Sequence, residues 1–109
     1  REIGIRKAVG ARARDIQTAR YAAMDLGNLR TNAQVSGPVL EEVARADAAG
    51  MALLRDAADS MRLSARGYHR VLRVARTLAD LDGAERVNRV HLAEALSYRA
   101  LADEARRAA

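Results

Sequence analysis

The sequence predicts an all-α fold, a small bundle of about five helices. Alanine, arginine and leucine, which all favour helices, dominate the composition. Apolar residues recur at steps of three and four along most of the chain, which is the period of an amphipathic helix. Glycine, proline, serine and asparagine separate these periodic segments and mark helix ends. A chain of 109 residues is expected to form one domain with a modest core.

The segment 63–83, LSARGYHRVLRVARTLADLDG, carries the strongest helical signal. Ser64 is a suitable N-cap, and Gly83 stands where a left-handed C-cap residue is expected. This pattern predicts the central helix of the bundle, with an inner stripe formed by Tyr68, Val71, Leu72, Ala75, Leu78 and Ala79.

Arg66 breaks a local rule in this helix. It lies about two residues inside the helix start, where the macrodipole makes a cation unfavourable by roughly 0.3–1 kcal/mol. A helix N-terminus together with an arginine suits a phosphate group. A solvated arginine without a role is the alternative. Arg70 and Arg73 follow at helical spacing on the same side.

Two helices are expected before the central one, beside a long first helix. The first helix spans 2 to about 26, with a thin apolar stripe at Ile5, Val9, Ala13, Ile16, Ala19, Ala23 and Leu26. Gly27 and Asn28 provide its C-terminal signal, and a loop follows. Ser36 and Pro38 then open a short helix, and Asp47 caps a helix over 48–61.

A last helix is expected over 89–102, with Asn88 as its N-cap. Its predicted inner stripe is Val90, Ala93, Leu96 and Ala100. The resulting organisation is a basic connecting helix at 1–30, a helical domain at 31–103 and a disordered tail at 104–109.

The sequence offers no self-contained active site and no metal site. It lacks cysteine, a glycine-rich phosphate loop and an apolar run long enough to cross a membrane. His69 and His91 lie on different predicted helices without a third ligand, and His69 is expected at the surface. We therefore expect a domain without membrane contact that serves as one part of a larger protein.

The net charge of +5 is also compatible with two alternatives to a part of a larger protein. A stand-alone DNA-binding module would place basic side chains on phosphates. A helical adaptor would instead bind partner helices through its alanine-rich stripes. The arginines assigned to phosphates in the first alternative are Arg14, Arg20, Arg70, Arg73 and Arg76.

Several segments resemble the C-terminal domain of magnesium-chelatase-like AAA+ ATPases, in particular the branch of competence protein ComM (YifB). These segments are LSARGYHRVLRVARTLADLDG and VHLAEALSYR, preceded by ARDIQTARY and TNAQVSG, and the resemblance covers about 13–99. By contrast, the segment 1–12, REIGIRKAVGAR, resembles a cytoplasmic stretch of MacB- and FtsX-type permeases.

The resemblance implies the helical lid that follows an AAA+ nucleotide-binding core in a cytoplasmic, hexameric ATPase. Arg66 would match the sensor-2 arginine, which reaches the γ-phosphate of ATP, and Arg70 would be a second nucleotide or interface contact. ATP and Mg would be bound mainly by the core of the same polypeptide. ComM-like members are DNA branch-migration helicases in natural transformation, whereas magnesium-chelatase members drive metal insertion into a porphyrin.

Overall fold

The computed structural model describes the backbone of residues 2–108 and the side chains of residues 12–108. Within this part of the chain there are five α-helices, one short 3₁₀ helix and no strand. The predicted all-α bundle is therefore confirmed. The elements are α1 (Glu2–Ala23), η1 (Asn32–Gln34), α2 (Gly37–Val43), α3 (Ala48–Ser60), α4 (Ala65–Leu81) and α5 (Arg89–Ala108).

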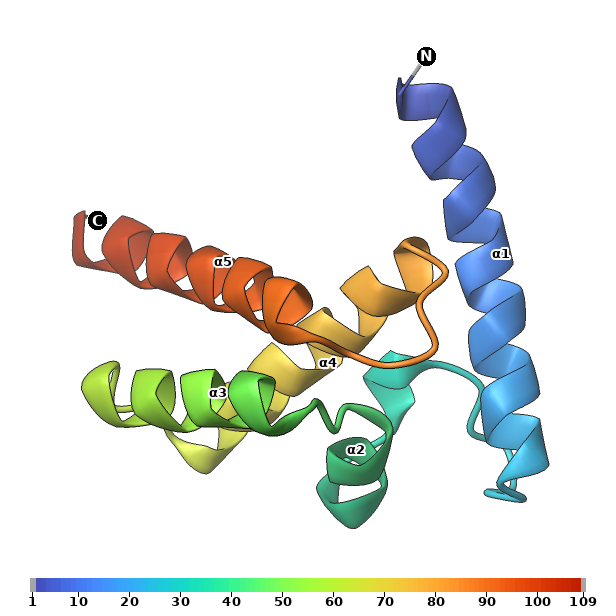
Figure 1. Cartoon of the computed structure of the whole chain (residues 1–109), viewed down its shortest axis with the longest axis horizontal. Helices are drawn as coiled ribbons and strands as arrows, with labels where there is room; N and C mark the ends of the chain where they lie inside the picture. The colour runs from blue at the N-terminus through green and yellow to red at the C-terminus, as the bar shows by residue number, and fades with distance from the viewer. Residues whose placement is uncertain (1, 109) are drawn as a thin grey trace.

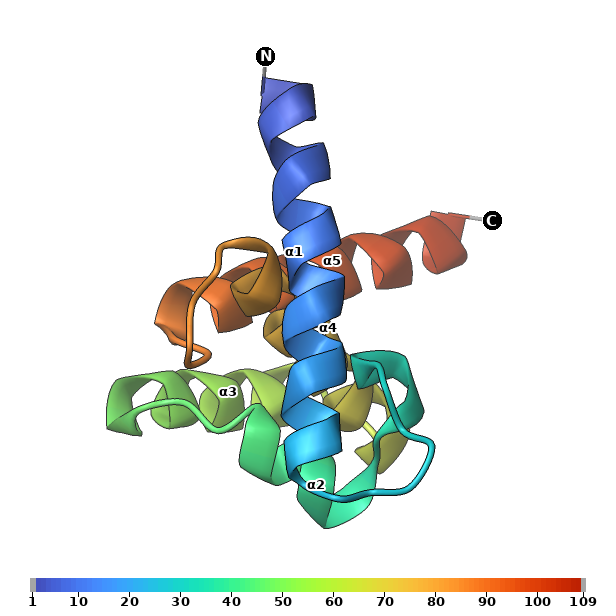
Figure 2. The ribbon, with the colours of Figure 1, turned by 90° about the vertical axis from the view of Figure 1, so that its right-hand side faces the viewer.

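Helix α4 is the centre of the bundle, as its apolar stripe predicts. It packs against α1, η1, α2 and α5, while α3 packs against α5. Helices α3 and α5 run side by side in the same direction, and α4 runs back across them (Figure 1). Helix α1 crosses α4 from the other side, and its N-terminal part projects away from the bundle (Figure 2). The buried residues of the α4 stripe are Val71, Leu72, Ala75, Leu78 and Ala79.

The predicted helix caps at Ser64, Asp47 and Gly83 are confirmed. The Ser64 hydroxyl accepts a hydrogen bond from the backbone N–H of Gly67 at 3.0 Å. The Asp47 carboxylate accepts one from Gly50 at 2.8 Å. Gly83 has φ +71°, a left-handed conformation that glycine adopts without strain. These caps fix where α3 and α4 begin and where α4 ends.

Two helix ends differ from the sequence prediction. Helix α1 ends at Ala23 rather than near 26, because Asp25 and Gly27 take left-handed conformations with φ +55° and +68°. Helix α5 continues to Ala108, so the residues expected to form a disordered tail are helical as far as the structure describes them. Ion pairs from Asp103 to the arginines one turn away on either side support this extension, as do arginines in the last turn.

The inner face of α5 differs from the predicted stripe. Of the predicted residues, Leu96 is buried, but Val90 is 69% exposed and Ala93 and Ala100 are exposed. The buried face consists of His91, Leu92, Ala95 and Leu96. The predicted stripe began at Val90 and left out His91, whose ring is hydrogen-bonded in the interior.

The C-terminal half of α1 packs into the bundle, which a solvated connecting helix would not do. Tyr21 is fully buried, and Ala13 and Gln17 are also buried. Ala19 and Ala23 of the predicted stripe are exposed, and the side chains of Ile5 and Val9 lie outside the described residues. The boundary between a first unit at 1–30 and a second at 31–103 stays a prediction.

Candidate functional site

The first turn of α4 presents an arginine to solvent. Ser64 is extended, with φ −71° and ψ 167°, and its hydroxyl closes the turn onto Gly67. Arg66 is the second residue of the helix, and its side chain is exposed. No described residue forms an ion pair or a hydrogen bond with its guanidinium. Since a cation here weakens the helix, the stability of α4 does not explain this arginine.

Arg99 of α5 lies against the same turn of α4. A Cβ placed on Gly67 would lie 3.4 Å from Nη2 of Arg99, an ordinary contact distance, so the guanidinium lies against this turn. Arg99 forms an ion pair with Asp103 at 3.4 Å, and Asp103 also binds Arg106. The hydrogen bond from Arg106 lowers the pKa of Asp103, and the charge of Arg99 adds to this effect.

A groove of about 330 Å³ runs between α4 and α5 next to this turn. Its lining combines apolar side chains with arginines and one tyrosine. Arg70, predicted as a second contact for nucleotide or interface, lines this groove one turn beyond Arg66. Arg99 and Arg106 could not be predicted as part of this site, because their proximity to α4 depends on helix packing. The lining residues are Arg70, Val71, Val74, Ala95, Tyr98, Arg99, Ala102 and Arg106.

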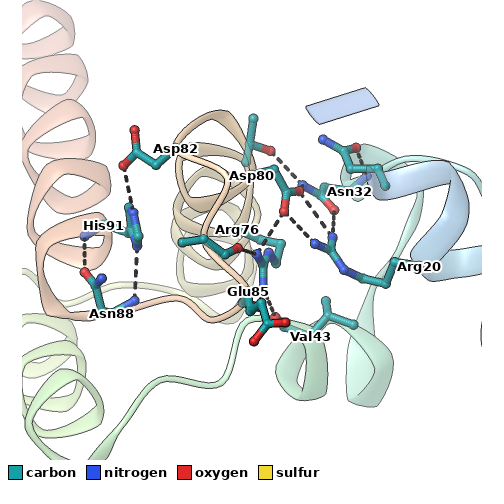
Figure 3. Close-up of polar contacts among 12 residues, drawn as sticks. Arg20, Asn32, Val43, Arg76, Asp80, Asp82, Glu85, Asn88 and His91 are labelled. Atoms are coloured by element: carbon teal, nitrogen blue, oxygen red, sulfur yellow. Dashed lines mark hydrogen bonds and ion pairs between the residues drawn. The ribbon is translucent and has the colours of Figure 1, made fainter. Parts of the chain in front are cut away.

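A second group of arginines surrounds Asp80 in the interior (Figure 3). Asp80 is fully buried, and its carboxylate accepts hydrogen bonds from Arg20 at 2.5 Å and Arg76 at 2.8 Å. Arg76 also donates to the backbone carbonyls of Val43 at 3.0 Å and Ala84 at 2.9 Å. Asp80 therefore joins α1 to α4, and Arg76 extends this link to the last residue of α2 and to the segment that follows α4.

Asn32 of η1 completes this network. Its amide donates to Asp80 at 2.9 Å, and its amide oxygen accepts from the hydroxyl of Tyr21 at 2.5 Å. The side chain of Gln17 accepts from the backbone N–H of Asn32 at 2.9 Å. Burial raises the pKa of Tyr21, which keeps the phenol protonated as a donor. The network therefore holds η1 against α1 and α4.

The ion pairs of Asp80 overturn one interpretation of the sequence. The DNA-binding alternative assigned Arg20 and Arg76 to phosphates, but both bind Asp80, and Arg76 is only 2% exposed. Arg73 is half-buried and donates to the carbonyl of Val35 at 3.0 Å. Of that set, Arg14 and Arg70 are exposed. The predicted phosphate-binding group is therefore wrong for Arg20 and Arg76, because they neutralise a buried carboxylate.

His91 connects α5 to the loop after α4. Asn88 caps α5, as predicted, by accepting from the backbone N–H of Val90 at 2.9 Å. The Asn88 backbone N–H donates to Nδ1 of His91 at 3.1 Å, which assigns the ring proton of neutral His91 to Nε2. Nε2 then donates to Asp82 at 2.9 Å (Figure 3). His91 thus has a structural role.

The other predicted histidine, His69, is half-buried, and its ring meets Tyr68 edge to face at 5.9 Å between ring centroids. Within the described residues, no group of three or more His, Cys, Asp or Glu side chains could hold a metal ion. The same part of the chain contains no helix with the length and apolar character needed to span a membrane.

Comparison with known proteins identifies the domain type. Residues 4–99 match the family described as magnesium chelatase, subunit ChlI C-terminal, and this range includes most of the segment 1–12 that resembles permeases. Competence protein ComM of Haemophilus influenzae is 39% identical over 72 residues, and YifB of Escherichia coli is 35% identical over 72 residues. An uncharacterized protein of Mycobacterium bovis is 50% identical over 70 residues.

These alignments cover 64–66% of this chain but only 14% of each relative, so the chain corresponds to a small part of those proteins. The family match covers most of the chain and includes α1 as well as the helices that follow. The chain therefore belongs to the family of the C-terminal domain of magnesium chelatase subunit ChlI.

Proposed function

We propose that this domain is the lid of a ComM-like AAA+ ATPase, with Arg66 as the sensor-2 arginine that contacts the γ-phosphate of ATP. The observation that carries the proposal is the placement of Arg66 at the start of α4. Its guanidinium is exposed and unpaired among the described residues, although its position costs helix stability. Membership in the family supports the same assignment.

The surroundings of Arg66 suit a phosphate contact that depends on orientation. The Ser64 cap fixes the first turn of α4, and the buried stripe of α4 anchors the helix in the bundle. Movement of the whole domain would therefore carry the guanidinium with it. In phosphoryl transfer, such a positioned cation stabilises charge on the transferred group. Closure of the lid would couple this contact to a domain movement.

The domain supplies one side of such a site. ATP would meet Arg66 here, whereas most contacts to ATP and Mg would come from the AAA+ core of the same polypeptide. Arg70 lines the neighbouring groove, so we assign the contact with the γ-phosphate to Arg66 alone. Because the chain is similar to ComM, we also propose that the full-length protein forms a hexamer and acts in DNA branch migration.

The test compares Arg66→Ala with Arg55→Ala in the full-length ATPase that contains this domain. Arg55 is an exposed arginine in the middle of α3, so the control removes the same charge elsewhere. We expect Arg66→Ala to lower ATP turnover about 10²-fold, the scale found when one positioned donor is removed. The control should retain turnover.

Thermal unfolding of the 109-residue domain separates this effect from misfolding. Arg66→Ala should change the free energy of unfolding by less than about 1 kcal/mol, because an unpaired cation leaves the positive helix end. Normal turnover in Arg66→Ala would show that the sensor-2 assignment is wrong. A loss of turnover with an unchanged domain stability would support it.

A further inference from the structure

We propose that the groove between α4 and α5 binds single-stranded nucleic acid. In this arrangement Arg70, Arg99 and Arg106 contact phosphates, and Tyr98 stacks on a base. The site is separate from the Arg66 contact, and it is tested on the domain alone. Its failure would therefore be distinguishable from failure of the proposed ATPase role.

The size and the floor of the groove favour a nucleoside unit. Val71 and Val74 of α4 and Ala95 of α5 supply an apolar floor. The volume of about 330 Å³ lies at the lower end of the range for ligand pockets, roughly 300–1,000 Å³. This space can admit a base with its sugar but not a duplex. A phosphate alone would gain nothing from the apolar floor.

The charges around the groove favour an anionic occupant. Three arginines line it, against Asp103, which binds both Arg99 and Arg106, and Glu94, which accepts a hydrogen bond from Tyr98. One carboxylate cannot occupy the donors of two guanidinium groups, each of which carries five N–H bonds. The Nε of Arg99 is buried and lies 3.4 Å from Asp103, so it is not one of the donors open to a ligand. Donors and net positive charge are thus left for phosphate oxygens.

Tyr98 favours a nucleic acid over an acidic peptide. Its side chain lines the groove yet is 52% exposed, which is unusual for a large aromatic residue. The Tyr98 hydroxyl donates to Glu94 at 2.9 Å, one turn earlier on α5, and this bond restrains the ring. An aromatic ring beside arginines over an apolar floor is the arrangement on which single-stranded bases stack.

Fluorescence anisotropy of the 109-residue protein with labelled oligo-dT, oligo-rU and a duplex of equal length tests the proposal. Both single strands should bind more tightly than the duplex, and the comparison of oligo-dT with oligo-rU shows which sugar is preferred. Tyr98→Ala should weaken single-strand binding about fivefold or more, because base stacking on an aromatic side chain is lost.

The charge contribution is tested with a matched pair of double variants. Arg70→Gln with Arg106→Gln removes two exposed arginines from the groove, and Arg45→Gln with Arg55→Gln removes two exposed arginines elsewhere. The groove variant should lower the slope of log affinity against log salt by about 1.4, or about 0.7 for each phosphate contact. Arg99 is left intact because it packs against α4, and thermal unfolding confirms that each variant folds.

Three outcomes would overturn the proposal. Equal weakening by the two double variants would show attraction by net charge without a site. Tighter binding of poly-glutamate than of oligo-dT would assign the groove to an acidic peptide. Unchanged affinity in Tyr98→Ala would exclude base stacking at this position.

Discussion

Two aspartates of this domain are each held between two arginines, and they differ mainly in burial. Asp80 lies between Arg20 and Arg76, and its side chain is 0% exposed. Asp103 lies between Arg99 and Arg106 on the last turns of α5, and its side chain is 28% exposed. The first group links α1 to α4, whereas the second borders the groove between α4 and α5.

Burial decides whether an arginine of this domain is committed to the fold. Around Asp80 each charge depends on the others, because water does not replace a lost partner and an unpaired buried ion is costly. Around Asp103 water solvates either partner, so the pairs contribute little to stability. The arginines near Asp103 can therefore exchange this carboxylate for a ligand, while those near Asp80 cannot.

The largest expected effect is that of Asp80→Asn. The variant keeps the shape of the side chain but leaves the buried guanidinium of Arg76 and the half-buried one of Arg20 without their negative partner. We expect a loss of about 3–5 kcal/mol in the free energy of unfolding, measured by urea denaturation of the domain. Asp56→Asn, the same change at an exposed position of α3, should stay within about 0.5 kcal/mol of the wild type. Equal stability of the two variants would contradict a structural role for the network.

Asn32→Ala should have an intermediate effect. It removes the acceptor of the buried Tyr21 hydroxyl and one donor to Asp80, but leaves the charges of the network unchanged. The expected loss is about 1–3 kcal/mol, the scale for leaving a buried polar group unsatisfied. Asn28→Ala, at an exposed position in the turn after α1, is the control for the residue type. If Asn32→Ala loses as much as Asp80→Asn, the buried charges are not what makes the network strong.

The sequence predicted the helices and the stripe of α4 because these features depend on neighbours in the chain. The caps at Ser64, Asp47 and Asn88 depend on residues two or three positions away, and they were predicted correctly. The same holds for Gly83, whose left-handed conformation follows from its place after α4. Local periodicity and capping were therefore enough to predict most of the helices and their ends.

The interior network was not predictable from the same patterns. Arg20 and Asp80 are 60 positions apart, and nothing in the spacing of arginines shows which of them meets a carboxylate in the core. Arg76 stands on α4 near the exposed Arg70 and the half-buried Arg73, and all three were assigned to phosphates. Arg76 and Asp80 form an i,i+4 pair on α4, which was the one local signal available.

The groove could not be predicted from the sequence either, because its walls belong to two helices and their separation depends on how these helices pack. Gly67 gave no signal of the groove, since Arg99 lies near this glycine only at ordinary contact distance. The sequence identified Arg66 and Arg70 as candidates, but it could not show that Arg70, unlike Arg66 at the helix start, lies in a groove.

The smallest expected effect is the pH dependence of the surface group. Because Arg106 and Arg99 lower the pKa of Asp103 below its ordinary value of 3.8, the ionised carboxylate favours the folded state. This contribution is fully present above 3.8 and is lost as the pH falls through the lower value of the folded state. Urea denaturation should therefore show a small difference between wild type and Asp103→Asn above 3.8 and none at strongly acidic pH.

Salt should affect the stability contributions of the two aspartates differently. Screening acts on exposed charges much more than on buried ones, so high salt should reduce the effect of Asp103→Asn and largely preserve that of Asp80→Asn. Carboxyl NMR titration of Asp103 measures its pKa directly, and Arg106→Gln should raise it. A pKa of Asp103 that Arg106→Gln leaves unchanged would show that this arginine is not its main partner, and the comparison between the two groups would then fail.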